Sequence, residues 1–179
     1  MTHIRRLDGG SLAVTVSDNE FIALSRLEAD LLGLLADRLT RLAAGTAGRD
    51  RMFPDAYRDD AEAAAEFHAL TDVDLVTAKS EAARNVMDAF IAAEQEASGS
   101  RWRRATSRTV TTDAELALAL VRNLTDLRLM VADRLGIEND DDDGSGGAAA
   151  DRVVYWWLGE TQELLVEALA ADAFGRETA

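Results

Sequence analysis

The stretch "TDAELALALVRNLTDLRLMVADRLG", residues 112–136, predicts an amphipathic helix and with it a helical fold class. Thr112 and Glu115 have the spacing of a capping box, in which a hydroxyl and a carboxylate satisfy the first free amides of a helix. Gly136 follows where glycine commonly ends a helix. Apolar residues recur between them every three or four positions and define a buried face: Leu116, Leu120, Leu124, Leu127, Val131 and Leu135.

Similar signals predict helices on both sides of this stretch. Ser25 and Glu28 have capping-box spacing ahead of a leucine-rich segment, and Thr71 and Asp74 have a shorter version of the same spacing. Each pair should open a new helix, and an aspartate at position 59 or 60 should cap a short one. The predicted helices are residues 26–42, residues 60–70, residues 71–97 and a last helix that begins at Asp151.

The N-terminal part has the composition of strands. The runs "SLAVTV" and "FIAL", separated by the polar "SDNE", predict a β-hairpin or three-stranded ribbon within residues 4–24. A length of 179 residues favours a single domain, residues 1–179. We therefore expect an all-α helical bundle of about five helices with a small N-terminal β-hairpin.

Residues 138–150, "ENDDDDGSGGAAA", have the composition of a mobile acidic loop. Asn139, Asp141, Asp143 and Gly144 match the start of a calcium-binding loop, but the twelfth position holds Ala150 instead of a glutamate. We therefore expect a hydrated linker and no metal site in this segment.

Charge and cysteine content restrict the class of function. The net charge of −14 repels phosphate, so nucleic-acid binding is disfavoured unless a local basic patch supplies it. The chain has no cysteine, which excludes disulfides and thiolate metal sites. No apolar run has the length of about 18 residues that a membrane span needs, and the N-terminus lacks a secretion signal, so we expect a cytoplasmic protein without a membrane anchor.

The segment "FPDAYRDDAEAAAEFHALT", residues 53–71, raises the question of a metal or catalytic site. Glu62, Glu66 and His68 are metal-ligand types, but the residue three before His68 is Ala65, which breaks the Glu-x-x-His pattern of helical metal sites. We therefore predict no catalytic, cofactor-binding or metal-binding residues, and nearly silent replacements of Glu62 and His68. The segment is interpreted as a scaffold whose structural residues are Phe53, Pro54, Asp55, Tyr57 and Phe67, with Phe67 in the core.

Two segments are candidate partner-binding surfaces. The first is "RWRRATSR", residues 101–108, interpreted as a polar connection whose Arg101, Trp102, Arg103 and Arg104 contact the chain's own acidic surface, an acidic partner protein or, alternatively, DNA. The second contains two adjacent tryptophans, which point about 100° apart on a helix. Trp157 should face the core, while Trp156 should lie half-exposed or form a partner or dimer surface.

Asn123 lies at the edge of the apolar face of residues 112–136. We expect it to hydrogen-bond the irregular backbone of the turn at residues 53–57, because buried backbone groups need partners. Asp126 and Arg128 follow on the same helix and are predicted to be structural.

Three blocks of the chain together resemble an actinobacterial family long catalogued as a domain of unknown function and also labelled oxidative-stress transcriptional regulators. The blocks are residues 53–71, "NLTDLRLMVADRLGI" (residues 123–137) and "YWWLGETQELLVEAL" (residues 155–169). The third block adds Tyr155 and Gln162 to the structural residues. The family tends to have an arginine at the position of His68, so the resemblance gives no reason to expect a fixed ion pair there.

The resemblance implies a non-enzymatic cytoplasmic regulatory protein that needs no cofactor and acts through protein partners. Family members are typically encoded beside the N-end-rule adaptor of the Clp protease, which makes a sigma factor or that protease-adaptor system the implied partner. Redox sensing by disulfide cannot be carried over, because the chain has no cysteine. The alternatives are a DNA-binding regulator that uses residues 101–108 and a metal-dependent hydrolase that uses acidic residues within 55–66.

Overall fold

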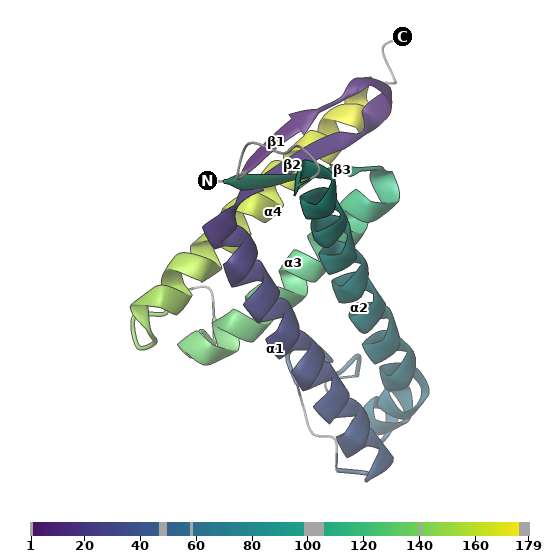
Figure 1. The fold of residues 1–179 in the computed structure, drawn as a ribbon. Coiled ribbons are helices and arrows are strands. Elements are labelled where there is room, and N and C mark those ends of the chain that lie inside the picture. The colour runs from purple at the N-terminus through teal and green to yellow at the C-terminus, as the bar shows by residue number, and fades with distance from the viewer. Residues whose placement is uncertain (1, 47–49, 58, 99–105, 140, 176–179) are drawn as a thin grey trace.

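The computed structural model describes residues 2–46, 50–57, 59–98, 106–139 and 141–175. Over these ranges, Figure 1 shows a small antiparallel sheet at one end of a set of helices. The prediction of an all-α bundle is therefore corrected to a mostly helical fold that includes a three-stranded sheet. Its elements are β1 (His3–Arg6), β2 (Leu12–Ser17), α1 (Asp18–Ala43), α2 (Ala61–Ser98), β3 (Ser107–Thr112), α3 (Ala114–Leu135) and α4 (Ala149–Gly175).

The sheet has the order β1-β2-β3, with both pairs antiparallel. The predicted N-terminal hairpin is confirmed, and the apolar residues of β2, which pairs with a strand on each side, are buried. The third strand was not predicted, since residues 101–108 were interpreted as a connection. The β-branched run Thr109 to Thr112 was the available signal, and Val14 pairs there with Val110.

Helix α1 begins eight residues earlier than the predicted start at position 26. Ser17 and Glu20 form a complete capping box, in which the Ser17 amide donates to Glu20 Oε2 at 2.7 Å. The run "FIAL" therefore belongs to a helix, and the expected β region up to residue 24 is wrong. Ser25 is not a cap, because its hydroxyl donates to the carbonyl of Phe21 one turn earlier in the same helix.

Helix α2 joins the two helices that were predicted to meet at Thr71. The Thr71 hydroxyl donates to the carbonyl of Phe67 at 2.8 Å, so it bonds within a continuous helix instead of opening a new one. Asp60 caps this helix as predicted, because its Oδ1 accepts from the amides of Glu62 and Ala63.

Helix α3 is the predicted helix with its cap shifted by one residue. Asp113 accepts from the amide of Leu116, whereas Thr112 is a fully buried residue of β3. Gly136 ends the helix with a positive φ of 67°, which confirms the predicted glycine cap. Helix α4 begins two residues before the predicted Asp151.

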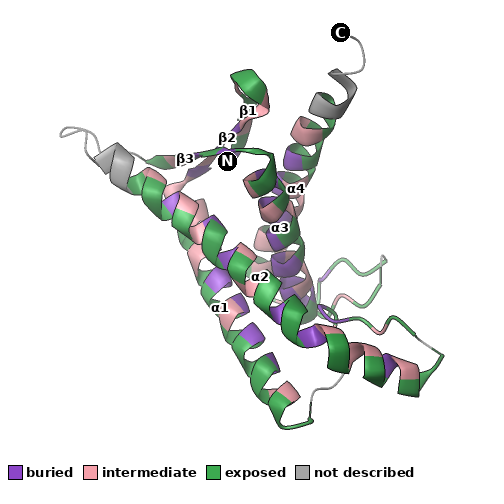
Figure 2. Ribbon diagram, turned by 90° about the vertical axis from the view of Figure 1, so that its right-hand side faces the viewer, coloured by how far each residue is buried: buried purple, intermediate pink, exposed green. Residues whose placement is uncertain are grey.

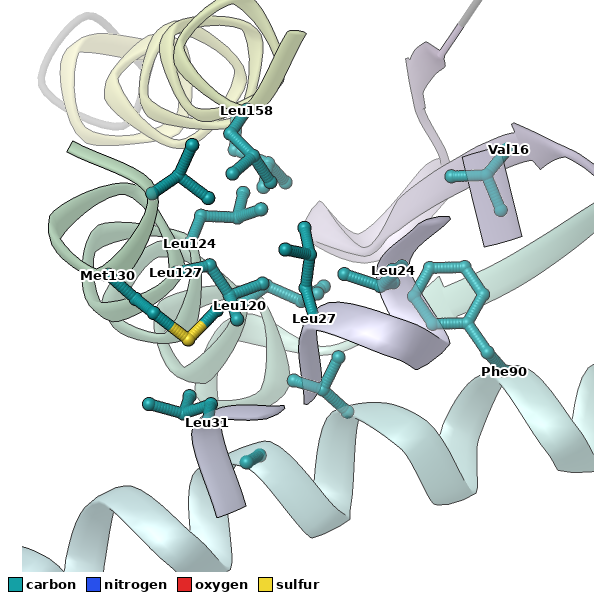
Figure 3. Close-up of a cluster of buried hydrophobic side chains, with 14 of the residues drawn as sticks. Val16, Leu24, Leu27, Leu31, Phe90, Leu120, Leu124, Leu127, Met130 and Leu158 are labelled. Atoms are coloured by element: carbon teal, nitrogen blue, oxygen red, sulfur yellow. The ribbon is translucent and has the colours of Figure 1, made fainter. Parts of the chain in front are cut away.

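The core forms where the helices meet below the sheet, and Figure 3 shows side chains of α1, α2, α3 and α4 converging there together with Val16 of β2. Among the described helices, none is long and apolar enough for a membrane span. The burial pattern in Figure 2 shows that α2 and α4 each keep an exposed outer face. The side chains of the core come from distant parts of the chain, including Leu27, Leu31, Phe90, Leu120, Leu127 and Leu158.

The acidic loop packs against the end of α3. Asp142 accepts from the amides of Glu138 and Asn139, and Arg152 donates to the carbonyl of Gly147 at 3.1 Å. Gly144 is buried against the side chain of Leu135. The described part of the loop is thus tied to its surroundings, and its mobility stays a prediction.

Gly147→Ala should lower the free energy of unfolding by about 1 to 3 kcal/mol, the usual cost of overpacking. A methyl group there would lie 2.6 Å from Cδ2 and 2.9 Å from Cα of Leu135. Gly146→Ala is the matched control, because nothing lies within 4 Å of a Cβ at that position. Chemical denaturation of both variants is the measurement, and equal effects would show that Leu135 does not restrict the loop.

Candidate functional site

The turn before α2 presents Asp55 and buries Phe53. Asp50 Oδ1 accepts from the amide of Met52 at 2.9 Å, and the Phe53 amide donates to the Asp50 carbonyl. Phe53 is only 1% exposed, so the turn places this ring in the core. Pro54 is exposed and Tyr57 is 53% exposed, so neither of these two scaffold candidates lies in the core.

Phe67 is half-buried at the start of α2 and is not part of the main core cluster. Its ring packs edge-on against Tyr57, with ring centroids 6.3 Å apart, and against His68. The prediction that Phe67 is a core residue is therefore wrong, because its helix turn faces the surface beside the exposed Tyr57.

Four side chains form an ionic chain, Asp55–His68–Asp72–Arg38, that links the turn, α2 and α1. His68 Nε2 lies 2.9 Å from Asp55 Oδ1, and its Nδ1 lies 2.9 Å from Asp72 Oδ1. The other oxygen of Asp72 accepts from Arg38, and both of these side chains are almost fully buried. The Arg38 guanidinium lies over the Phe53 ring, 4.8 Å from its centroid.

His68 contacts two carboxylates that were not predicted from the sequence. Because of these contacts, we now expect its replacement to be destabilising instead of nearly silent. Hydrogen bonds to Asp72 and then to Asp55 hold the pKa of His68 above its ordinary value of 6.5, although burial opposes them. Both ring nitrogens are occupied by carboxylates, which leaves neither nitrogen available to take a proton from a substrate.

His68→Gln should destabilise the protein most at low pH. A histidine with a raised pKa in the folded state contributes its full stability below its unfolded pKa and loses it as the pH rises through the folded pKa. The difference in unfolding free energy between wild type and H68Q should therefore shrink as the pH rises above 6.5. Denaturation across this range is the measurement, and a difference that does not change with pH would contradict the protonated bridge.

An open cavity of about 1100 Å3 lies between α1, the turn and α3. Asp55 and Arg38 both line it, so both ends of the ionic chain border this space. Among the described lining residues, four arginines are matched by four aspartates. The charges balance, and the lining therefore indicates no preference for a cation or an anion.

A second polar group, here called the buried junction, lies inside the contact of α1, α2 and α3. Asn123 Nδ2 donates to Glu28 Oε2 at 3.2 Å, and Lys79 donates to Asp126 Oδ1. Glu28 and Asn123 are each 1% exposed. Asn123 is thus buried, but its partner is Glu28 instead of the turn at residues 53–57, which corrects the prediction.

The predicted structural residues of α3 and α4 meet each other. Arg128 donates to Gln162 Oε1 at 3.0 Å, and its guanidinium lies 5.0 Å from the centroid of the Tyr155 ring. Trp157 is half-buried and donates to the Thr2 hydroxyl, so it attaches the N-terminus to α4. These contacts hold α4 in a fixed orientation on α3.

The outward face of α4 carries an exposed stripe, called the α4 stripe. Val153 is 70% exposed and Trp156 is 61% exposed, while Leu158 and Leu165 face the core from the opposite side. At 100° per residue the stripe follows one side of the helix. Its members are Val153, Trp156, Glu160, Glu163 and Glu167, all of them exposed.

The basic segment is only partly described. Arg101, Trp102, Arg103 and Arg104 lie outside the described residues, so their predicted role stays a prediction. Arg108 belongs to β3, where it donates to Asp18 and Glu94 and its guanidinium lies 3.9 Å from the centroid of the Phe21 ring. Its charge is therefore already compensated within the chain.

No group of three or more histidine, cysteine, aspartate or glutamate side chains is placed to hold a metal ion within the described ranges. Glu62 and Glu66, two of the metal-ligand candidates, are exposed. Sequence reasoning missed Glu28, Arg38, Asp72 and Lys79. The available signal was weak: Glu28 and Arg38 continue the spacing of Leu24, Leu31 and Leu35 on the buried side of α1.

Comparison with known proteins identifies a family. The family model described as a domain of unknown function, DUF2017, matches residues 1–169. No curated protein and no solved structure matches the chain. The matched region contains the ionic chain, the buried junction and the α4 stripe, and the family description names no activity.

Proposed function

Because the chain belongs to the DUF2017 family, whose description names no activity, we propose its function from its own geometry: it is a non-enzymatic regulatory protein that binds another protein through the α4 stripe. The observation that carries the proposal is the exposure of Trp156, at 61%, on a helix whose opposite face is buried. Tryptophan is enriched among the residues that dominate the binding energy of protein interfaces.

The charges of the stripe define the partner. Glu160, Glu163 and Glu167 follow Val153 and Trp156 on the same side of α4. Complementary potentials steer association, so the partner should present a basic segment beside an apolar pocket for the tryptophan. A second copy of the chain fits less well, because it would bring three glutamates against three glutamates on a protein of net charge −14.

The ionic chain and the buried junction support a non-enzymatic role. His68 has no free ring nitrogen, and Glu28 and Asn123 of the buried junction are shielded from substrate by the helices around them. The resemblance to oxidative-stress regulators makes a sigma factor or the protease-adaptor system, both cytoplasmic, the first partner to test. DNA binding through residues 101–108 is the alternative.

The test places a photo-activated cross-linking residue at position 153, which keeps Trp156 in place, and, as a control, at the exposed position 62 of α2. We expect a cross-link from position 153 to a basic segment of one protein, and none from position 62. A cross-link to a second copy, or equal yields from both positions, would contradict the proposed surface. A DNA-binding titration at several salt concentrations tests the alternative of DNA binding, because phosphate contacts weaken steeply as the salt concentration rises.

A further inference from the structure

The buried junction contains two oxygen atoms that have no donor. Glu28 Oε2 accepts from Asn123 Nδ2, but Glu28 Oε1 and Asn123 Oδ1 accept from no group in the described part of the chain. Both atoms are buried, and leaving a buried acceptor without a donor costs folding free energy. An ionised Glu28 would leave both costs in place.

A single proton removes both costs. A proton on Glu28 Oε1 turns that atom into a donor, and the free acceptor of the same residue pair is Asn123 Oδ1. The two side chains would then form a carboxylic acid–amide pair in which each side chain donates once and accepts once. We propose that Glu28 is a proton-binding site that is occupied in the folded protein near neutral pH and makes the contact of α1 with α3 sensitive to pH.

The surrounding charges support an occupied proton site. From α3, Asp126 adds a second carboxylate near Glu28, and from α2, Lys79 binds Asp126 and lies 21% exposed. Burial raises the pKa of Glu28, the hydrogen bond from Asn123 lowers it and the Asp126 carboxylate raises it, and together they place it at about 7. Burial likewise raises the pKa of Asp126, which Lys79 opposes.

The direction of the pH effect follows from these values. In the unfolded chain Glu28 has its ordinary pKa of 4.5, so the folded state binds the proton more tightly. The stabilisation is complete below pH 4.5 and is lost as the pH rises through about 7. Above that pH, a buried carboxylate lies between α1 and α3 and weakens their contact.

The test is a titration of the wild-type protein, followed at the side-chain carboxyl carbon of Glu28 by nuclear magnetic resonance. Assignment through the bonds of the residue itself needs no variant. We expect a midpoint near 7, far from the ordinary value of 4.5. A midpoint at the ordinary value would overturn the proposal.

Glu28→Gln supplies an independent readout, because an amide resembles the protonated acid and cannot ionise. The unfolding equilibrium constant of wild type should rise relative to that of E28Q by at least about tenfold between about pH 5 and about pH 8. Glu62→Gln is the matched control, since Glu62 is exposed. A ratio of wild type to E28Q that stays constant over this range would also overturn the proposal.

Discussion

Asp72→Asn should lower the free energy of unfolding by about 3 to 5 kcal/mol, the range seen when one partner of a buried ion pair is removed. Asp72 is 1% exposed and bonds both Arg38 and His68. Without its charge, the 3% exposed Arg38 keeps a buried positive charge that is no longer matched by its carboxylate partner.

Asp74→Asn is the matched control for this loss. Asp74 is exposed on the same helix, two residues away, and has the same chemistry without the burial. Denaturant titrations of the two variants at one pH give the comparison. Similar midpoints for both variants would mean that the ionic chain contributes little to the fold.

Phe53→Ala should cost about 3 to 5 kcal/mol, as large-to-small changes in a core do. The ring is 1% exposed, and both the Arg38 guanidinium and the Lys79 ammonium lie over it, the latter 5.9 Å from its centroid. The substitution would remove both the packing of the ring in the core and its cation–π contacts with Arg38 and Lys79. Calorimetry or denaturant titration measures the change.

Phe67→Ala is the control for this second variant, and it should cost clearly less because Phe67 is only half-buried. The sequence alone predicted Phe67 as the core residue of this segment, whereas in the structure Phe53 is the buried one. An equal or larger loss of unfolding free energy for Phe67→Ala would show that the start of α2 contributes more to core packing than its exposure indicates.

The helices were predictable where local chemistry decides their ends. The Gly136 cap and the Asp60 cap depend on residues next to each other in the chain, and both are confirmed. Capping-box spacing, by contrast, occurs at Ser17 and Glu20 as well as at Ser25 and Glu28. Local spacing does not choose between two such pairs, because the choice depends on where β2 leaves the sheet.

The candidate site was less predictable, because its contacts join distant residues. Glu28 and Asn123 lie 95 positions apart, and Arg38 and Asp72 lie 34 apart. A single sequence shows that each is polar on a mostly apolar face, but it does not show which polar residue lies opposite. The exposure of Trp156 could be predicted from the sequence, since two adjacent tryptophans on a helix cannot both face one core.

The proposal of a protein-binding α4 stripe is tested most directly by the dissociation constant of the cross-linked partner for wild type, Trp156→Ala and Leu70→Ala. Leu70 is the control, because it is 72% exposed on α2 and lies outside the stripe. We predict that Trp156→Ala weakens binding by about 30-fold or more, as expected for a dominant interface residue, and that Leu70→Ala leaves it unchanged. Wild-type affinity in Trp156→Ala would contradict the proposal.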